Sequence, residues 1–554
     1  MNSKVARVRE SCTAHGVRVR HLLCLLAAMC VAGSLVVANS GAIDVSAQTL
    51  SPGRGATVAR QSKLPSPEKI IGDYLKALGG KKRVAVIRDA TYEWLTAESA
   101  AEDGERTRRR TKTPAAERTD VPTTGGELST AASQRSAWMQ MPGGFSQTLT
   151  GADAQTAKLQ AALNASRLVD FKKLNVLART LSLEQLDGEP AYVVEFSTRE
   201  GGRLRYWFGA SNKLLRQVAD DTRRATVRFG DYRVVKSVLE PHRVTQRIEG
   251  EEPRTLMLQS VRYNTGLAES IFDPPVSSEI IDVPALLRDV ASNQTELDGR
   301  VSEYTFTRKQ TEREINDRGE LKKEKVIVHE VYPVVGGGRV LKLISEGGMP
   351  LPPDKATKEE KRVVDELAKA EREYEERQQK RARVKAEREK KKGNETGVGE
   401  NGDDDLGISA FLRACEFVSP RRERFRDRDA VVFDFRARPG FRPTTRDQSL
   451  IVKLAGVVWI DPSDKQVMRL EARLVDGFKI GGGLLASVRS GSNFAFEQAR
   501  MVDGVWLPRF SQISASAKVF LLAGFKLDAT REYSDYKRFS TKTVDAVLDA
   551  PLKP

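Results

Sequence analysis

The chain has 554 residues, four cysteines and a formal net charge of +16. Its length gives room for two or three hydrophobic cores, which excludes a single small domain. A basic excess of this size would suggest a nucleic-acid partner in a cytoplasmic protein. The amino terminus predicts export instead, and we therefore expect no nucleic-acid partner.

The amino terminus has the layout of an export signal. Four arginines between Arg7 and Arg20 precede an apolar run, Leu22–Ala38, and Val45–Ala47 then supplies the small residues that a signal peptidase accepts. We predict a signal peptide over residues 1–47, a linker over 48–65 and a mature protein in the periplasm. The alternative is an uncleaved membrane anchor, because the 17 residues of the apolar run reach the lower limit for a span.

Beyond residue 47 the chain keeps a net charge of +13, since the five basic and two acidic residues before it account for +3 of the total of +16. This excess has two interpretations: attraction to anionic lipid surfaces, or solubility alone. Cys415 is the one cysteine in this part of the chain, so no internal disulfide is expected. We expect it to be a buried small side chain rather than a nucleophile.

Residues 66–275 predict a helix followed by an antiparallel meander. Ser66–Glu68 supplies a capping hydroxyl, a first-turn proline and a carboxylate, and Gly79-Gly80 ends the helix. A strand over Ala90–Glu98 and a second helix over Thr150–Ala165 follow. Asp187-Gly188 between alternating segments is a strong hairpin signal. Further strands are predicted at Thr180–Gln185, Ala191–Phe196, Leu204–Phe208, Leu214–Val218, Thr226–Tyr232, Arg243–Ile248 and Thr255–Tyr263.

Residues 282–551 predict a second domain that opens on a helix capped by Asp282. An insertion over 354–405 interrupts it. Residues 354–392 are helix formers with 15 basic and 11 acidic side chains, so this helix buries little, and Gly393–Asp405 should be flexible. The insertion either recruits a protein partner or is a tolerated surface feature. Strands resume with the segments Val431–Phe435, Leu454–Ile460, Val467–Leu474, Asn493–Ala499, Arg509–Ala515, Val519–Phe525 and Ala529–Tyr536.

The two halves repeat one another. Trp207–Lys213 matches Trp459–Lys465, and the spacing Arg233, Val235, Val238, Pro241 recurs as Arg500, Val502, Val505, Pro508. Each half closes on a similar phrase, Ile271–Pro275 and Val547–Pro551. A repeat of this length is too long for a solenoid unit and indicates a duplicated domain.

The offset between matched residues grows from 252 at Trp207 to 267 at Pro241, which indicates 15 extra residues in the second half. The candidate is Gly477–Gly491, whose tip, Gly483, Leu484 and Leu485, is apolar. Such a tip either contacts lipid or folds back on the sheet.

No catalytic constellation is evident. Beyond the leader the histidines are His242 and His329, which lie in different halves without a Cys or His at metal spacing. No Gly-x-Ser-x-Gly elbow is present, and Gly481–Gly483 lacks the Gly-Lys-Ser/Thr of a phosphate loop. We therefore expect neither an enzyme nor a cofactor.

The remaining pattern is a pair of long antiparallel sheets with helices able to cover one face of each. A twisted sheet that curls without closing makes a trough, and helices across its mouth leave an apolar cavity suited to an acyl chain. The predicted lining consists of strand aromatics: Tyr92, Trp94, Trp138, Tyr192, Trp459, Phe494 and Phe520.

These features resemble the LolA/LolB-like superfamily of outer-membrane lipoprotein-sorting proteins. The resemblance lies in the order of weak motifs and in their duplication. The motifs are Ser66–Gly80, Asp187–Tyr192, Trp207–Lys213 and Phe272–Pro275 in the first half, and Trp459–Lys465, Val505–Pro508 and Tyr533–Tyr536 in the second. The resemblance implies an α+β fold of two tandem half-barrels of curved antiparallel sheet with helical lids, and a cavity for lipoprotein acyl chains.

The sequence thus favours a periplasmic, non-enzymatic carrier-type protein that binds lipid or lipoprotein acyl chains, possesses a membrane-contact loop at Leu484-Leu485, and is a monomer. The alternative is an envelope stress sensor or scaffold of the RseB type, which would act on protein partners through residues 354–392. Relatives of the sorting type are single compact domains, so the duplication and the charged insertion depart from that pattern.

Overall fold

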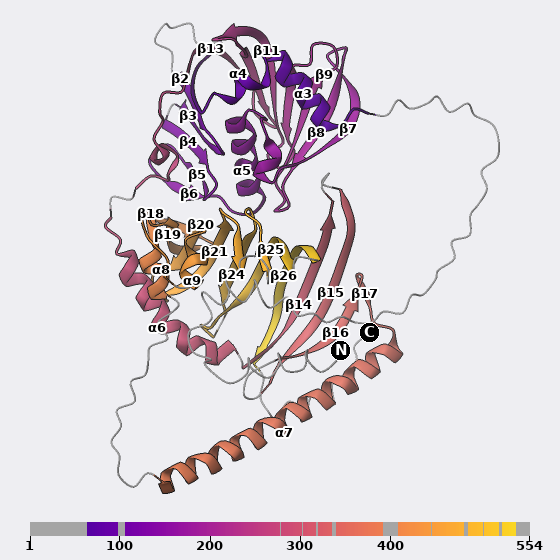
Figure 1. The fold of residues 1–554 in the computed structure, drawn as a ribbon, viewed down its shortest axis with the longest axis vertical. Helices are drawn as coiled ribbons and strands as arrows, with labels where there is room; N and C mark the ends of the chain where they lie inside the picture. Colours follow the sequence, from indigo (N-terminus) through magenta and orange to yellow (C-terminus); the bar gives the residue numbers. More distant parts are fainter. Residues whose placement is uncertain are drawn as a thin grey trace, which may run out of the picture.

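The computed structural model describes residues 64–97, 106–123, 125–276, 279–301, 303–316, 320–334, 339–391, 408–444, 446–480, 486–501, 503–519 and 523–538 (Figure 1). The predicted leader (1–47), almost all of the linker, the segment Gly393–Asp405 and the closing phrase Val547–Pro551 lie outside the described residues.

The first domain is one 13-stranded antiparallel sheet with helices on one face. Its strand order is β6-β5-β4-β3-β2-β1-β13-β12-β11-β10-β9-β8-β7. The strands are β1 (Asp89–Thr96), β2 (Arg106–Lys112), β3 (Ala116–Thr123), β4 (Gly126–Ala132), β5 (Ala137–Gln140), β6 (Ser146–Thr148), β7 (Leu177–Leu186), β8 (Glu189–Ser197), β9 (Arg203–Gly209), β10 (Leu215–Asp220), β11 (Ala225–Val235), β12 (Val238–Ile248) and β13 (Arg254–Tyr263). The helices are α3 (Pro67–Ala77), α4 (Lys81–Ala85), α5 (Gly151–Ser166) and the 3-10 turns η1 (Phe171–Leu174) and η2 (Glu269–Phe272).

The second domain repeats this order as β17-β16-β15-β14-β26-β25-β24-β21-β20-β19-β18. Its strands are β14 (Tyr304–Ile315), β15 (Leu321–Pro333), β16 (Arg339–Glu346), β17 (Met349–Pro350), β18 (Cys415–Phe425), β19 (Arg428–Ala437), β20 (Leu454–Asp461), β21 (Gln466–Leu474), β22 (Phe478–Ile480), β23 (Ala486–Val488), β24 (Asn493–Arg500), β25 (Trp506–Val519) and β26 (Ala523–Arg538). Its helices are α6 (Val283–Val301), α7 (Pro353–Lys391), α8 (Ile408–Ala414) and α9 (Arg446–Ile451).

The repeated sequence motifs occupy equivalent turns of the two sheets. Trp207–Lys213 joins β9 to β10, and Trp459–Lys465 joins β20 to β21. Lys213 and Lys465 both have positive φ, 62° and 52°. The predicted 15-residue addition is also confirmed, because Gly477–Gly491 contains an extra hairpin, β22–β23, that has no counterpart in the first sheet.

Local signals placed the helix and hairpin ends correctly. Ser66 caps α3 by accepting a hydrogen bond from the Lys69 amide at 3.3 Å, and Gly79 follows the helix with φ of 119°. A side chain at Gly79 would also meet the Ser237 carbonyl oxygen at 2.4 Å. Asp187 and Gly188 both have positive φ, as a tight β7–β8 hairpin requires.

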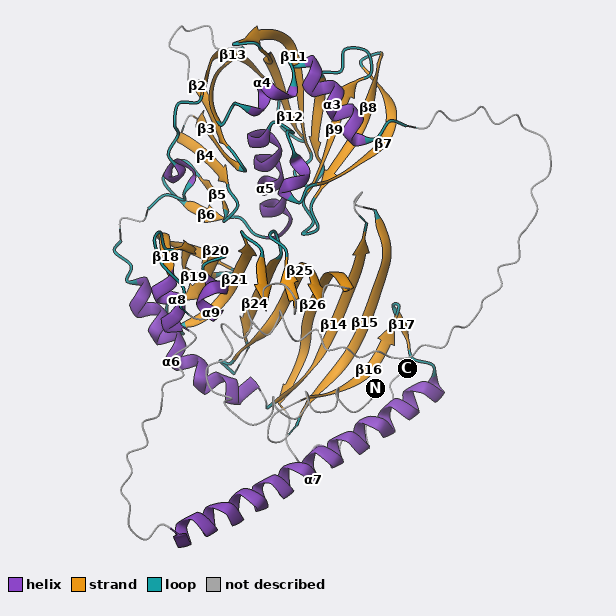
Figure 2. Cartoon of the chain, viewed as in Figure 1, coloured by secondary structure: helices purple, strands orange, loops and turns teal. Residues whose placement is uncertain are grey.

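We call the helix-packed face of each sheet its inner face. In the first domain, α3 and α5 pack on it and form one core with the strands. Leu159 and Leu163 of α5 lie in that core beside Phe196, which makes edge-to-face contacts with Phe171 and Tyr206 at ring-centroid distances of 5.6 and 4.9 Å. In the second domain, α6, α8 and α9 cover the inner face over β18–β21 and β24 (Figure 2).

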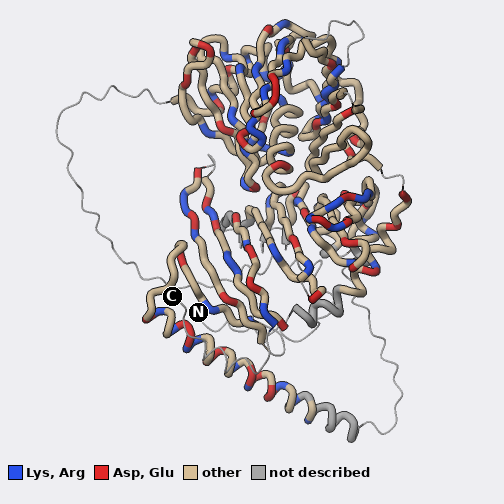
Figure 3. Tube along the Cα trace, turned by 180° about the vertical axis from the view of Figure 1, so that it is seen from behind, with Lys and Arg blue, Asp and Glu red and all other residues tan. Residues whose placement is uncertain are grey.

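The two domains differ in the helical segment that links the two halves of each sheet, between β6 and β7 in the first domain and between β17 and β18 in the second. In the first domain this helix is α5, which contacts β2, β3, β4, β5 and β9 and so covers the inner face. In the second domain the chain between β17 and β18 forms two helices. The short α8 packs in the core, whereas α7 contacts β16 and then extends away beyond the strand ends (Figures 1 and 2). Charged side chains of both signs along α7 explain why it does not pack on an apolar face (Figure 3).

The first turns of α7 dock on the part of β16 that the two-residue edge strand β17 leaves unpaired. Glu359 accepts the Leu343 amide at 2.8 Å, and Arg362 donates to the Leu341 carbonyl. Val363 packs with Tyr332 and Val340. The helix thereby satisfies backbone groups that an edge strand would otherwise offer to another chain.

We predict that Phe196→Ala lowers the free energy of unfolding of the first domain by about 3–5 kcal/mol, because it removes a fully buried ring and leaves a cavity. Val234→Ala, at a side chain that is 71% exposed, is the control and should change it by less than about 0.5 kcal/mol. Urea denaturation followed by far-UV circular dichroism measures both, and equal effects would contradict the described core.

Candidate functional site: the domain junction and the inner face of the second sheet

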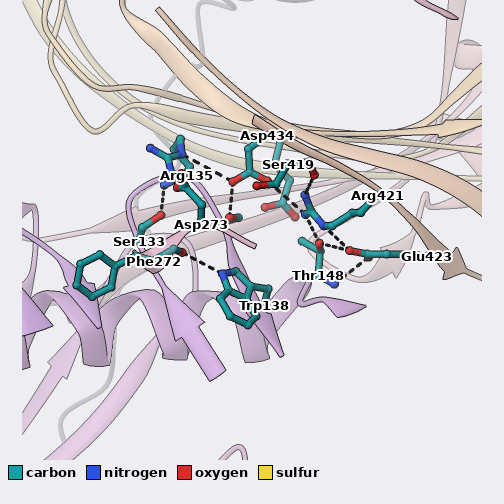
Figure 4. Close-up of polar contacts among 12 residues, drawn as sticks. Ser133, Arg135, Trp138, Thr148, Phe272, Asp273, Ser419, Arg421, Glu423 and Asp434 are labelled. Carbon is teal, nitrogen blue, oxygen red and sulfur yellow. Dashed lines mark hydrogen bonds and ion pairs between the residues drawn. The ribbon is translucent and has the colours of Figure 1, made fainter. Parts of the chain in front are cut away.

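A buried polar network joins the two domains (Figure 4). Glu423 of β18 accepts hydrogen bonds from the Thr148 amide at 2.8 Å and from the Thr148 hydroxyl at 2.6 Å. Ser136 donates to Asp434 of β19 at 2.5 Å. Thr148 is at the end of the edge strand β6, so the second domain supplies the partner that this strand end lacks within its own sheet.

Arg421 is the cation at the centre of this network. It is 2% exposed and makes ion pairs with Glu423 at 2.7 Å and Asp434 at 3.2 Å. It also donates to Thr148, and Arg135 of the first domain lies 3.7 Å from Asp434. These groups depend on one another, because removing one member leaves an uncompensated charge away from water.

Two cavities flank the junction, with volumes of about 230 and 300 Å³. Both domains line the smaller one, which holds a buried ion cluster. Burial acts to raise the pKa of Glu471 there, but the charges of Lys158 and Arg469 lower it below its ordinary value. Both volumes are at or below the lower limit for pockets that enclose drug-sized ligands, about 300 Å³, so we do not place an acyl chain in them.

The inner face of the second sheet continues from its core onto strands that bear no helix. Directly paired residues of an antiparallel ladder project on the same face. The core residue Phe494 pairs with Ile513, and Ile513 pairs with Ala529 of β26. The next row runs from Phe496 through Ser511 and Arg531 to Gln310 of β14.

We call the inner-face positions of β14, β15, β16, β25 and β26 the uncovered inner face, because none of the packed helices α6, α8 and α9 lies over these strands in the part of the chain that is described. It carries three buried side chains, Phe306, Val331 and Ala529, among half-buried ones. The half-buried ones are Ile327, Leu341, Leu343, Ile513 and Tyr533. Phe306 and Tyr533 confirm the shared face, since their ring centroids are 5.8 Å apart.

The structure brings together only some of the residues predicted to line a cavity. Tyr92 and Trp94 stack at 6.4 Å in the core of the first domain, and Tyr192 packs against that core. Trp138 is buried near the junction, where its Nε1 donates to the Phe272 carbonyl at 3.0 Å. Trp459 lies on the face opposite to Phe494. Phe520 and the loop Gly483, Leu484 and Leu485 lie outside the described residues, and the lining role of all these residues stays a prediction.

The titratable groups singled out in the sequence lie apart from one another in the structure. His242 and His329 lie in different domains, and burial raises the pKa of the Cys415 thiol to about 12. Within the described ranges, no three His, Cys, Asp or Glu side chains come together as a metal would need. Of the helices in those ranges, none is long and apolar enough to cross a membrane.

Comparisons with known proteins find likeness in structure alone. No protein-family model and no curated protein matches the chain. A LolA-superfamily protein from Nitrosomonas europaea is 17% identical, with 38% of this chain and 99% of that one covered at a TM-score of 0.27. LprF from Mycobacterium bovis is 9% identical, with 38% and 100% covered at 0.16. MucB in the MucA/MucB complex of Pseudomonas aeruginosa is 8% identical, with 85% and 99% covered at 0.13.

The fold class is the α+β class that the sequence predicts: two antiparallel sheets of the same strand order, each curved around helices on one face (Figure 1). The chain's own strand order establishes this. The identities are below 25% and the TM-scores below 0.5, and a likeness at this level does not indicate what the chain binds or does.

We predict that Arg421→Gln lowers the free energy of unfolding by about 3–5 kcal/mol, because Glu423 and Asp434 then stay buried without their cation. Arg422→Gln is the matched control. Its ion pair with Glu279 is about half exposed, so its loss should cost less than about 1 kcal/mol. Chemical denaturation monitored by tryptophan fluorescence compares the two, and similar losses would show that the junction network does not stabilise the fold.

Proposed function

We propose that the protein is a non-enzymatic lipid-binding protein of the bacterial envelope, and that its second domain binds the acyl chains of a lipoprotein or another envelope lipid. The observation that supports this is the uncovered inner face, which continues an apolar core without a helix over it. In the first domain, by contrast, α5 and the core side chains occupy the corresponding space. We therefore assign binding to the second domain.

Physical magnitudes favour a chain-like apolar ligand. Each methylene removed from water contributes about 0.8 kcal/mol, so about eight buried methylenes contribute roughly 6 kcal/mol before the entropy cost of association. Side chains such as Ile327, Leu343 and Ile513 are only half-buried and would lose water contact in the same event. Exposed apolar surface on these strands also favours aggregation, which a bound lipid would prevent.

The test compares two neighbouring residues on opposite faces of β15. Ile327 pairs with Gln310 on the uncovered inner face, whereas Val328 pairs with Lys309 on the other face, and both are half-buried. We expect acyl lipids to co-purify with the native protein, and Ile327→Asp to reduce the bound lipid at least about tenfold, because a carboxylate resists burial against a chain. Val328→Asp should retain the lipid.

Mass spectrometry of solvent extracts measures the lipid per protein, and circular dichroism checks that both variants are folded. Native protein without any acyl lipid, or equal loss in both variants, would overturn the proposed assignment.

A second function rests on α7, which supports the sensor or scaffold alternative. Only its first turns dock, through Glu359, Arg362 and Val363, and beyond Leu367 its described side chains are mostly exposed. A long charged helix fixed at one end presents both signs of charge to a partner (Figure 3).

For this function we predict that deleting residues 370–391 abolishes a specific protein complex and leaves the bound lipid unchanged, because the docked turns remain. Quantitative pull-downs from envelope extracts compare the deletion with the full chain and with Ile327→Asp. A partner that is lost only in the deletion supports the alternative, and an unchanged set of bound proteins removes it.

A further inference from the structure

Four basic side chains gather on the uncovered inner face. Arg308 of β14 pairs directly with His329 of β15 on one side and with Tyr533 of β26 on the other. Arg531 of β26 lies one row away and donates from Nε to Gln310 at 3.0 Å. Arg339 of β16 stacks over Phe306, with its guanidinium carbon 5.3 Å from the ring centroid.

Arg308 and Arg531 are half-buried, and no carboxylate in the described part of the chain forms an ion pair with either of them. Among the described residues, the buried Nε of Arg308 and Nδ1 of His329 have no hydrogen-bond partner. Glu312, the next carboxylate along this face of β14, accepts from Gln310 at 2.5 Å. Glu359 of α7 also faces His329, but it is paired with Arg362.

The electrostatic effect of this crowding appears in two pKa values. Burial, followed by the charges of Arg531 and Arg339, lowers the pKa of Arg308 below its ordinary value. Burial and the charge of Arg308 likewise lower the pKa of His329, against the opposing effect of Glu359. The charged forms of Arg308 and His329 are therefore destabilised in the free protein, and a bound anion would stabilise them.

The first domain shows how the fold neutralises such a charge when it is structural. Arg167, also on the inner side, makes an ion pair with Glu240 and donates to the Tyr92 hydroxyl at 2.5 Å. Tyr263 donates to the same carboxylate. The second domain has no equivalent of Glu240 among the described residues that contact Arg308 or Arg531, so its cations lack an internal counter-charge.

We propose that the ligand of the second domain is an acyl lipid with an anionic head, a phosphate or carboxylate, which accepts hydrogen bonds from Arg308 and Arg531 beside His329. Apolar side chains flank these groups in both directions along the strands, Phe306 and Val331 on one side and Ile327 and Ile513 on the other. A chain and a charged head therefore find partners on one face. This inference rests on the proposed lipid-binding function and specifies its ligand class.

The experiment uses the full chain after delipidation and three probes: dodecyl phosphate below its critical micelle concentration, dodecanol with the same chain, and inorganic phosphate. Calorimetry or competition with a fluorescent acyl probe gives the dissociation constants. Because charge-assisted hydrogen bonds are about twice as strong as neutral ones, we expect dodecyl phosphate to bind at least about tenfold tighter than dodecanol.

Two neighbouring substitutions on β14 provide the matched comparison. Arg308→Gln should weaken binding of dodecyl phosphate much more than binding of dodecanol, and so remove most of the preference. Lys309→Gln should keep the preference, because Lys309 is on the opposite face and makes a half-exposed ion pair with Glu532. Arg531→Gln, on β26, should have the same effect as Arg308→Gln. Agreement between the two variants would exclude a local folding defect in β14 as the cause.

The outcomes separate the two proposals. Equal affinity for dodecyl phosphate and dodecanol would overturn the anionic head group and leave lipid binding intact. Binding of inorganic phosphate as tight as that of dodecyl phosphate would also overturn it, because the site would then take a free anion. Failure of both chain-bearing probes to bind would overturn the inference together with the proposed function.

Discussion

The structure depends on covering one apolar face of each long antiparallel sheet. A sheet of this kind must bury that face against another layer, and here the layer consists of a few helices drawn from the same chain. In the first domain, α3 and α5 complete the cover and the interior becomes a continuous core. In the second, α6, α8 and α9 cover only the part around β18–β21 and β24. One physical reason is that α7 carries charges along its length and, unlike α5, does not pack on the inner face.

The two copies therefore differ, within one topology, in what packs on the inner face of the sheet. The first has its inner arginine neutralised by Glu240 and its interior filled, which suits a structural unit. The second leaves both apolar surface and positive charge without partners from the described chain, which suits a ligand. This difference arises within one topology, because the strand order and turn motifs stay the same while the helices between the two halves of each sheet differ.

A buried polar network, rather than apolar packing, joins the two domains at their junction. Its central groups, Arg421, Glu423 and Asp434, are charged and buried. Arg421 forms ion pairs with both carboxylates, and the Thr148 amide donates a hydrogen bond to Glu423. A network of this kind adds little net stability over an apolar contact but penalises any displacement, since a moved partner leaves a buried charge behind. It fixes the orientation of the domains, while the small cavities beside it have room for water or small polar groups rather than for a lipid chain.

Local chemistry in the sequence determined the caps of α3, the Asp187-Gly188 hairpin, the added hairpin within Gly477–Gly491 and the exposed character of α7, because each depends on residues close together in the chain. It did not reveal β2, Arg106–Lys112, whose polar residues form a strand only through pairing with β1 and β3. Nor did it separate Trp459 from Phe494, since a one-residue difference in register decides the face on which a strand residue lies. The cluster of Arg308, His329 and Arg531 was equally invisible, because strands far apart in sequence bring it together. Tertiary pairing alone decided which charges meet and which face is left open.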